Sequence, residues 1–260
     1  MRAASHATEL VLADRRDGVL TITLNRPGQR NAVNHEVAVQ LGSALDRLDA
    51  DPELSAGVLT GAGGTFCAGM DLKAFARGEL PTLPGRGFGG LTRTVLRKPL
   101  IAAVEGWALG GGFELALACD LIVAAENATF GSPEVRWGIV AAEGGMVRLP
   151  HRMPYHAAVR LLLTGEPLPA TRAEQYGLVN ELTAPGGALE KAHELAARVA
   201  KNAPRALAAV KEVLRATQGL SDGDAFERQD EIIAGVLSSE DAREGASAFA
   251  EKRAPVWHGR

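Results

Sequence analysis

The 260-residue sequence contains only two cysteines, Cys67 and Cys119, and both lie among apolar or small residues. Two cysteines are too few for a disulfide framework, so reduced thiols are expected. The longest apolar stretches are interrupted by Glu105, Glu114 and Asp120, and none is long enough to cross a bilayer. The start of the sequence lacks the apolar run of a signal peptide. We therefore expect a cytoplasmic protein with no membrane partner.

Aromatic residues and positive charge are also limited. Aromatic side chains make up 5% of the chain, and the formal net charge is -3 at pH 7. Nucleic-acid-binding surfaces are usually basic and often use stacking aromatics, so no nucleic-acid partner is expected. The sequence also has no G-x-S-x-G elbow, no histidine pair with zinc-ligand spacing, and no complete dinucleotide or phosphate-loop motif. These common kinds of active site are therefore unsupported.

Patterns typical of strands and helices alternate through much of the chain, and the 46% of apolar residues can form a substantial core. Strand-like runs at 8–13 and 18–24 flank an Asp-Gly pair, which predicts a hairpin. Asn34 is a good N-cap for a helix that ends near residue 51. The alternation predicts an α/β fold with repeated ββα or βαβ units and a largely buried sheet. Further apolar runs of strand length lie at 57–60, 100–104 and 121–123.

Two later regions have a different character. Residues 78–90 are rich in glycine and proline and predict a mobile surface segment. Beyond about residue 154 the pattern is wholly helical, with amphipathic stripes. Ser238, three residues before Asp241, predicts the start of a last helix that runs through Phe249. These stripes must pack either on the chain's own core or on another subunit, and the sequence leaves both open.

Two glycine-rich turns, at 64–72 and 109–114, each join an apolar strand to a probable helix. Glycine lets the backbone approach a ligand closely, and the start of a helix leaves amide donors unpaired. Two such turns side by side would direct two N–H groups at one oxygen, as an enolate or another oxyanion requires. Either turn alone is better explained by tight packing between strand and helix.

Two glutamates follow these turns. Glu114 lies in the first turn of an apolar helix, with no cationic partner nearby in the sequence. Glu134 follows Pro133, and taken alone it is best explained as a residue that complements a helix dipole. If both carboxylates face one cavity, they can hold a water molecule between them. One would then remove a proton from the water while the other delivers a proton to carbon.

Five segments match a known pattern: FCAGMDLK at 66–73, IAAVEGWALGGGFELALACD at 101–120, FGSPEVRWGI at 130–139, Asn25-Arg26-Pro27 and Gly177-Leu178-Val179. With these segments the sequence resembles the enoyl-CoA hydratase/isomerase (crotonase) family. The resemblance extends from about Leu10 to the C-terminus. It implies a crotonase-like ββα-spiral core over residues 1–195 and a C-terminal helical trimerisation region over 196–260. Homotrimers or dimers of trimers are the expected assemblies.

The resemblance also implies roles for particular residues. The backbone N–H groups of Met70 and Gly111 match the oxyanion hole that holds the thioester carbonyl. Glu114 and Glu134 match the two catalytic glutamates of the hydratases, and which of them acts as base and which as acid is left open.

The same resemblance assigns a binding loop for coenzyme A. Ala68, Asp71, Leu72 and Lys73 match the loop that holds the adenine end of the molecule. Coenzyme A is part of the acyl-CoA thioester substrate, and neither a metal nor a redox cofactor is expected.

One stretch departs from the family pattern. Hydratases of the family usually have a proline before the paired glycines, whereas this chain has Ala141 there and an additional carboxylate, Glu143. The simpler interpretation is that Glu143 is solvated at the start of a helix. The alternative places it with Trp137 near the acyl pocket, where it would favour a polar or cationic acyl chain.

The predicted function is that of a 2-enoyl-CoA hydratase, a hydro-lyase that forms 3-hydroxyacyl-CoA as in fatty acid β-oxidation. Residues 87–92 and the tail 251–260 also resemble carnitinyl-CoA dehydratases, which hydrate crotonobetainyl-CoA. An enoyl-CoA isomerase is a further alternative. A non-catalytic acyl-CoA-binding protein would be expected to lack one of the glutamates, and this sequence has both. The length and identity of the acyl chain are not determined.

Overall fold

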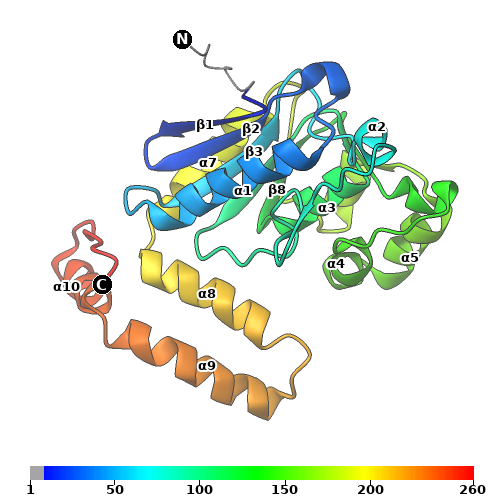
Figure 1. The fold of residues 1–260 in the computed structure, drawn as a ribbon. Coiled ribbons are helices and arrows are strands. Elements are labelled where there is room, and N and C mark those ends of the chain that lie inside the picture. Colours follow the sequence, from blue (N-terminus) through cyan, green and yellow to red (C-terminus); the bar gives the residue numbers. More distant parts are fainter. Residues whose placement is uncertain (1–8) are drawn as a thin grey trace, which may run out of the picture.

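The structure is a computed structural model that describes residues 9–260. A sheet lies at its centre (Figure 1). It has six strands in the order β1-β2-β3-β6-β8-β11. The first two strands pair antiparallel, and the other neighbouring pairs are parallel. The strands are β1 (Val11–Arg16), β2 (Val19–Leu24), β3 (Ala56–Gly61), β6 (Leu100–Val104), β8 (Leu121–Ala125) and β11 (Glu181–Thr183).

The predicted hairpin is confirmed. Asp17 and Gly18 connect β1 to β2, and Arg16 pairs with Val19. Both turn residues have positive φ, 50° and 76°, as a two-residue type I′ turn requires. The first strand continues beyond its expected end at Ala13, because the turn itself needs only two residues.

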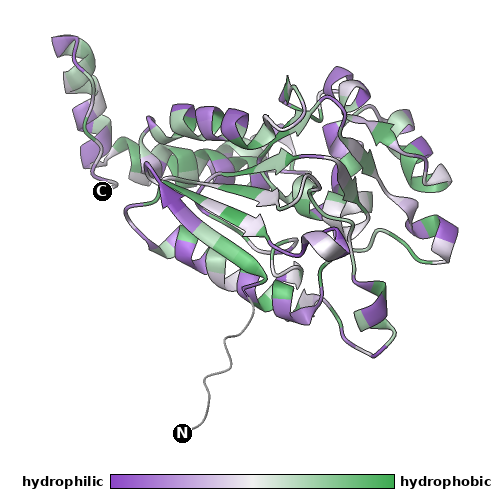
Figure 2. Cartoon of the chain, turned by 90° about the horizontal axis from the view of Figure 1, so that it is seen from above, coloured by the Kyte–Doolittle hydropathy of each residue, from purple (hydrophilic) through white to green (hydrophobic). Residues whose placement is uncertain are grey.

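One helix packs on each face of the sheet. The first, α1 (His35–Ala50), begins as predicted at Asn34, whose Oδ1 accepts a hydrogen bond from the Val37 amide at 3.0 Å. The opposite face is covered by α7 (Ala188–Ala200), and hydrophobic residues gather on the central strands (Figure 2). Small side chains allow α7 to pack closely, and those it buries are Ala188, Ala192 and Ala196.

A second, three-stranded sheet has the order β10-β9-β7. Its strands are β7 (Trp107–Leu109), β9 (Thr129–Gly131) and β10 (Leu168–Pro169). Because β7 and β9 run parallel, their carboxyl ends lie together, and the Gly110 amide donates to the Gly131 carbonyl at 2.9 Å. Two segments far apart in the sequence therefore emerge side by side: Gly110-Gly111, which starts α3 (Gly111–Ala118), and the short helix η2 (Pro133–Trp137).

The prediction of a surface segment at 78–90 is wrong for residues 87–90, which are buried. β4 (Thr82–Leu83) pairs with β5 (Gly87–Phe88), and Phe88 is 4% exposed. Its glycines permit close packing as well as turning. A Cβ atom on Gly90, for example, would lie 2.9 Å from the Ala38 carbonyl oxygen.

The region beyond residue 154 is mainly helical, but β10 and β11 contradict the prediction that it is wholly so. Strands of two or three residues are too short to give a periodic signal. The cap of the last helix is also shifted by one residue, because Ser239 accepts from the Ala242 amide at 3.0 Å whereas Ser238 ends the preceding helix. The remaining helices are η1 (Pro27–Gln29), α2 (Leu72–Phe75), α4 (Gly145–Arg152), α5 (Tyr155–Thr164), α6 (Ala170–Gln175), α8 (Pro204–Ala216), α9 (Asp222–Leu237) and α10 (Glu240–Glu251).

The last three helices extend away from the sheet (Figure 1). The predicted division after residue 195 falls inside α7, whose Ala196 still packs on the sheet. No residue of α9 is buried. None of the helices in residues 9–260 is both long and apolar enough to cross a membrane. Exposed apolar side chains on these three helices are Val210, Leu214, Phe226, Leu237 and Phe249.

Candidate active site

The structure brings the two predicted glycine-rich turns into contact. Cys67 pairs with β7 as an isolated β-bridge. Its amide donates to the Trp107 carbonyl at 2.9 Å, and its carbonyl accepts from the Leu109 amide at 3.0 Å. Two residues later, Gly69 has a φ of +93°, and a Cβ atom there would lie 3.2 Å from the Gly111 amide nitrogen. The backbone after Gly69 and the start of α3 therefore border one small space.

The amides on either side of Met70 are occupied, but its own is not. Gly69 N–H donates to the Cys67 sulfur at 3.4 Å, and Asp71 N–H donates to the Val33 carbonyl at 2.9 Å. The structure gives no hydrogen bond from the Met70 N–H to any residue of 9–260. Gly111 is the first residue of α3, so its N–H has no acceptor within the helix. Both amides are thus available to a ligand oxygen.

Glu114 lies one turn into α3 with only 4% of its surface exposed. Its Oε1 accepts two backbone hydrogen bonds, from Glu143 at 2.8 Å and from Gly145 at 2.9 Å. Burial raises the pKa of Glu114 to about 7; these two amides oppose the shift, and the charges of Glu134 and Glu143 add to it. Both protonation states are therefore accessible near neutral pH, which suits a general acid or base.

Glu134 reaches the same space from η2. It is 9% exposed, and its Oε2 accepts a hydrogen bond from Ser132 Oγ at 2.9 Å. A Cβ atom on Gly110 would lie 3.3 Å from Glu134 Oε1, so this carboxylate lies beside the start of α3. The charge of Glu134 acts on Glu114, and the sharing of one cavity by the two carboxylates stays a prediction. Ser132 was not predicted as a site residue. Its position two residues before Glu134 could have indicated that its hydroxyl contacts the carboxylate.

A second residue that sequence analysis missed is Phe88. Its ring packs against Gly111, where a Cβ atom would lie 2.5 Å from Cζ of Phe88. Gly111 is therefore required for packing as well as for access to its amide. Because Phe88 belongs to the glycine-rich 78–90 segment, only the tertiary structure links it to the site.

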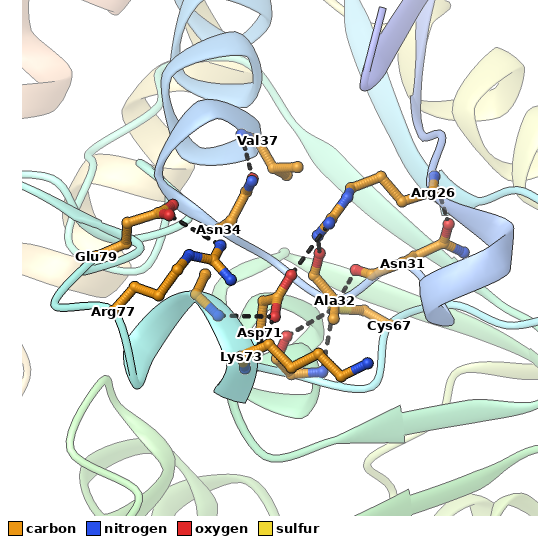
Figure 3. A network of polar contacts seen from close by, with 12 residues as sticks. Arg26, Asn31, Ala32, Asn34, Val37, Cys67, Asp71, Lys73, Arg77 and Glu79 are labelled. Carbon is orange, nitrogen blue, oxygen red and sulfur yellow. Dashed lines mark hydrogen bonds and ion pairs between the residues drawn. The ribbon is translucent and has the colours of Figure 1, made fainter. Parts of the chain in front are cut away.

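The loop predicted to bind coenzyme A lies on both sides of Met70: Ala68 precedes it, with its amide donating to the Arg30 carbonyl at 3.0 Å, and Asp71, Leu72 and Lys73 follow it. Figure 3 shows Asp71 and Lys73. Asp71 caps α2 by accepting from the amides of Lys73 and Ala74, both at 3.1 Å, and it pairs with Arg26 at 3.0 Å. Desolvation tends to raise the pKa of Asp71, but the Ala74 amide, Arg26 and the Lys73 amide together bring it below its ordinary value. Asp71 thus holds the loop, whereas Leu72 and Lys73 are exposed to solvent.

The other two residues named from sequence lie in different surroundings. Trp137, at the end of η2, is 74% exposed. The side chain of Glu143 is only 17% exposed and is hydrogen-bonded to Phe88, Thr92 and Arg93. The interpretation of Glu143 as a solvated residue is therefore wrong. A role for either residue in an acyl pocket stays a prediction.

The two cysteines are free thiols buried in the core, as expected. Burial raises the pKa of the Cys67 thiol to about 12, so it is protonated and unreactive at neutral pH. Within residues 9–260, no three His, Cys, Asp or Glu side chains are grouped to hold a metal ion.

A family model described as enoyl-CoA hydratase/isomerase matches residues 14–260. The chain belongs to this family of enzymes and has its crotonase fold, as the sequence predicted. Among solved structures, an enoyl-CoA hydratase from Mycobacterium tuberculosis H37Rv is 53% identical, with a TM-score of 0.94 over 96% of this chain and 99% of the other.

Relatives with another name are similar at slightly lower identity. A carnitinyl-CoA hydratase from Mycobacterium avium is 45% identical, with a TM-score of 0.78 over 98% of this chain and 100% of the other. A carnitinyl-CoA dehydratase from Salmonella typhi is 46% identical over 251 residues, which cover 93% of this chain and 95% of that protein. Both names describe reactions on acyl-CoA thioesters.

Proposed function

We propose that the chain is a 2-enoyl-CoA hydratase that reversibly adds water to the double bond of an acyl-CoA thioester. One observation carries the proposal: two buried carboxylates lie at the start of α3, Glu114 within its first turn and Glu134 beside Gly110. The amides of Met70 and Gly111 next to them are unengaged. An isomerase needs only to move a proton within its substrate. Two carboxylates allow one to activate water while the other protonates carbon.

The reaction uses each of these groups once. The N–H groups of Met70 and Gly111 hold the thioester carbonyl oxygen and stabilise the negative charge it gains. One glutamate takes a proton from water as the water oxygen bonds to C3. The other gives a proton to C2, and the enolate collapses to the 3-hydroxyacyl thioester. The addition is redox-neutral, so we propose that it needs no redox cofactor. Because the two amides stabilise the charge on the carbonyl oxygen, we propose that it needs no metal either.

The Glu114 carboxylate is well placed for such proton transfer. Both of its hydrogen bonds fall on Oε1, and this leaves Oε2 for the substrate or the water. For the coenzyme A part of the substrate, we propose the loop that contains Ala68, Leu72 and Lys73. Its exposed lysine can meet the negative charge of the nucleotide, and Asp71 fixes the shape of the loop.

A carnitinyl-CoA dehydratase is the second candidate, because relatives 46% identical to this chain carry that name. Its acyl group bears a fixed positive charge. The carboxylate that the sequence offered for this charge is that of Glu143, and it already accepts hydrogen bonds from Phe88, Thr92 and Arg93. These contacts support an uncharged acyl chain.

A substrate panel tests the proposal. With purified protein, we expect crotonyl-CoA to give a kcat/KM at least about tenfold above that of crotonobetainyl-CoA, since a desolvated cation without a counter-ion loses more than about 1.4 kcal/mol. The rates are measured from the loss of enoyl thioester absorbance, and the product is identified in each case. The reverse preference would favour the second candidate. Migration of the double bond without hydration would indicate an isomerase, and no turnover of any enoyl-CoA would contradict the proposal.

We also propose that the chain forms homotrimers or dimers of trimers through α8–α10. Large apolar side chains lie exposed there, including Leu214 at 71% and Phe226 at 63%, and exposed apolar patches usually mark interaction sites. Analytical ultracentrifugation is expected to give three or six times the 27.2 kDa chain mass, and Leu214→Lys is expected to weaken the assembly. A wild-type protein that sediments as a monomer at micromolar concentration would contradict this.

A further inference from the structure

We infer that Glu143 is a positioning residue whose carboxylate holds the 140–145 loop against residues 87–93, so that the loop's amides fix the carboxylate of Glu114. The inference rests on the proposed function of Glu114 in hydration. It assigns Glu143 a role in the geometry of the site instead of in the recognition of the acyl chain.

The Glu143 carboxylate accepts three hydrogen bonds. Its Oε2 accepts from the Phe88 amide at 2.9 Å and from Thr92 Oγ1 at 2.8 Å, and its Oε1 accepts from Arg93 Nη2 at 2.9 Å. Thr92 is only 1% exposed. Packing around Oε2 is tight, because a Cβ atom on Gly87 would lie 2.6 Å from it. All three donors come from one short segment, so this single side chain joins two loops.

The 140–145 loop also holds the carboxylate of Glu114. The amides of Glu143 and Gly145 both donate to Oε1 of Glu114. No side chain of residues 9–260 donates to that carboxylate, so its orientation depends on where these two amides lie. A shift of the loop would move both hydrogen bonds together.

Arg148 supports the same junction from α4. One of its guanidinium nitrogens donates to the Thr92 carbonyl at 2.6 Å, and another donates to the Glu143 carbonyl at 3.3 Å. The arginine thereby joins the backbones of the two loops that the Glu143 side chain also connects. Gly144 has a φ of +119°, and a Cβ atom there would lie 1.8 Å from Arg148 Nη1, so a larger residue would displace the end of this guanidinium.

Glu143 is also linked to the proposed oxyanion hole. Glu143 holds the amide of Phe88, and the ring of Phe88 packs against Gly111, whose N–H is one of the two amides proposed to bind the carbonyl oxygen. One side chain is thus linked to both the carboxylate of Glu114 and the oxyanion hole. Because all three donors occupy the Glu143 carboxylate, it is not itself free to transfer a proton to the substrate.

The test compares Glu143→Gln and Thr92→Val with Glu126→Gln, the same acid-to-amide change at an exposed position just after β8. A glutamine at position 143 keeps the size of the side chain, but it presents one acceptor atom to three donors. We expect Glu143→Gln to lower kcat for crotonyl-CoA by roughly 10–100-fold, since small displacements of catalytic groups have effects of this size. Thr92→Val is expected to lower it by about 3–10-fold, with KM changed less than kcat in both variants.

The pH profile of kcat/KM separates positioning from charge. The charged groups that influence Glu114 are Glu134, Glu143 and Arg148. Removing the negative charge of Glu143 alone would lower the pKa of Glu114, whereas loss of the two amide hydrogen bonds would raise it. Thr92→Val keeps every charge. We therefore expect the apparent pKa that its kcat/KM profile gives for Glu114 to be higher than in wild type, whereas Glu126→Gln should give the wild-type value.

Each outcome decides the inference. A wild-type kcat in Glu143→Gln, or an apparent pKa of Glu114 that moves only downward, would overturn it and leave Glu143 as a neighbouring charge. If Glu143→Gln does not fold, the milder Thr92→Val decides by the same two readouts. Failure of the proposed function is distinct, because the wild-type protein would then not hydrate crotonyl-CoA.

Discussion

Replacing Glu114 by glutamine is expected to lower kcat for hydration of crotonyl-CoA by roughly 10²–10⁴-fold, the usual contribution of a general acid or base. Glutamine keeps an oxygen that can accept from the amides of Glu143 and Gly145, so the shape of the site is preserved. Only proton transfer is lost. Initial rates and direct measurement of crotonyl-CoA binding separate the two effects, and binding is expected to persist.

The companion variant is Glu134→Gln, for which a loss of similar size is expected. Because the two carboxylates act on one water and one substrate, the double variant is expected to be far less impaired than the product of the two single losses. If either single variant keeps nearly full activity, the role proposed for that glutamate is wrong.

The free energy of unfolding, measured as a function of pH, shows whether Glu114→Gln is folded. The pKa of Glu114 is raised from 4.5 to about 7 in the folded chain, so ionising it there is less favourable than in the unfolded chain. This cost is absent below about pH 4.5 and fully present above about pH 7, where it amounts to roughly 3 kcal/mol. Glu114→Gln removes the cost. Relative to wild type, the variant is thus expected to gain stability in urea unfolding as pH rises from 5 to 8.

Replacing Gly69 by alanine is expected to lower kcat/KM by roughly 10²–10³-fold, the effect of losing one oxyanion-hole donor. A Cβ atom at this position would lie 2.7 Å from the Leu109 carbonyl oxygen and 3.2 Å from the Gly111 nitrogen. The added methyl group must therefore push apart the two turns whose amides face one space. The positive φ of Gly69 adds backbone strain of about 1 kcal/mol or more.

Gly64→Ala is the matched control for that strain. Gly64 lies in the same glycine-rich turn with a φ of +72°, but a Cβ atom there would meet nothing within 4 Å. Both substitutions are expected to lower the melting temperature, whereas only Gly69→Ala should lose most of its activity. Equal activity losses in the two variants would contradict the proposed contact between the turns and the thioester carbonyl.

Much of this site could be predicted because its chemistry is concentrated in short segments. The turn around Met70 and the turn that leads into Glu114 each contain glycines where the backbone must come close to something. Their contact requires Cys67 to pair with β7, which no local pattern reveals. The N-cap at Asn34 and the Asp-Gly hairpin were predictable for the same reason, since each depends on only a few neighbouring residues.

Predictions failed where the partner of a residue lies far away in the chain. Residues 78–90 have the composition of a surface loop, yet Phe88 is buried against Gly111. Glu143 has the sequence context of a solvated helix start, yet its partners lie 50 to 55 residues earlier. Strands as short as β10 exist only because a neighbouring strand pairs with them.

The family, the α/β character, and the two acids and two amides proposed for the chemistry could be predicted from sequence, because each depends on a short run of adjacent residues. The tertiary structure alone decided that the two turns touch, that Glu114 is held through the loop of Glu143, and that Asp71 supports its loop. Long-range hydrogen bonds and packing set these relations, and they depend on how distant segments approach one another in the folded chain.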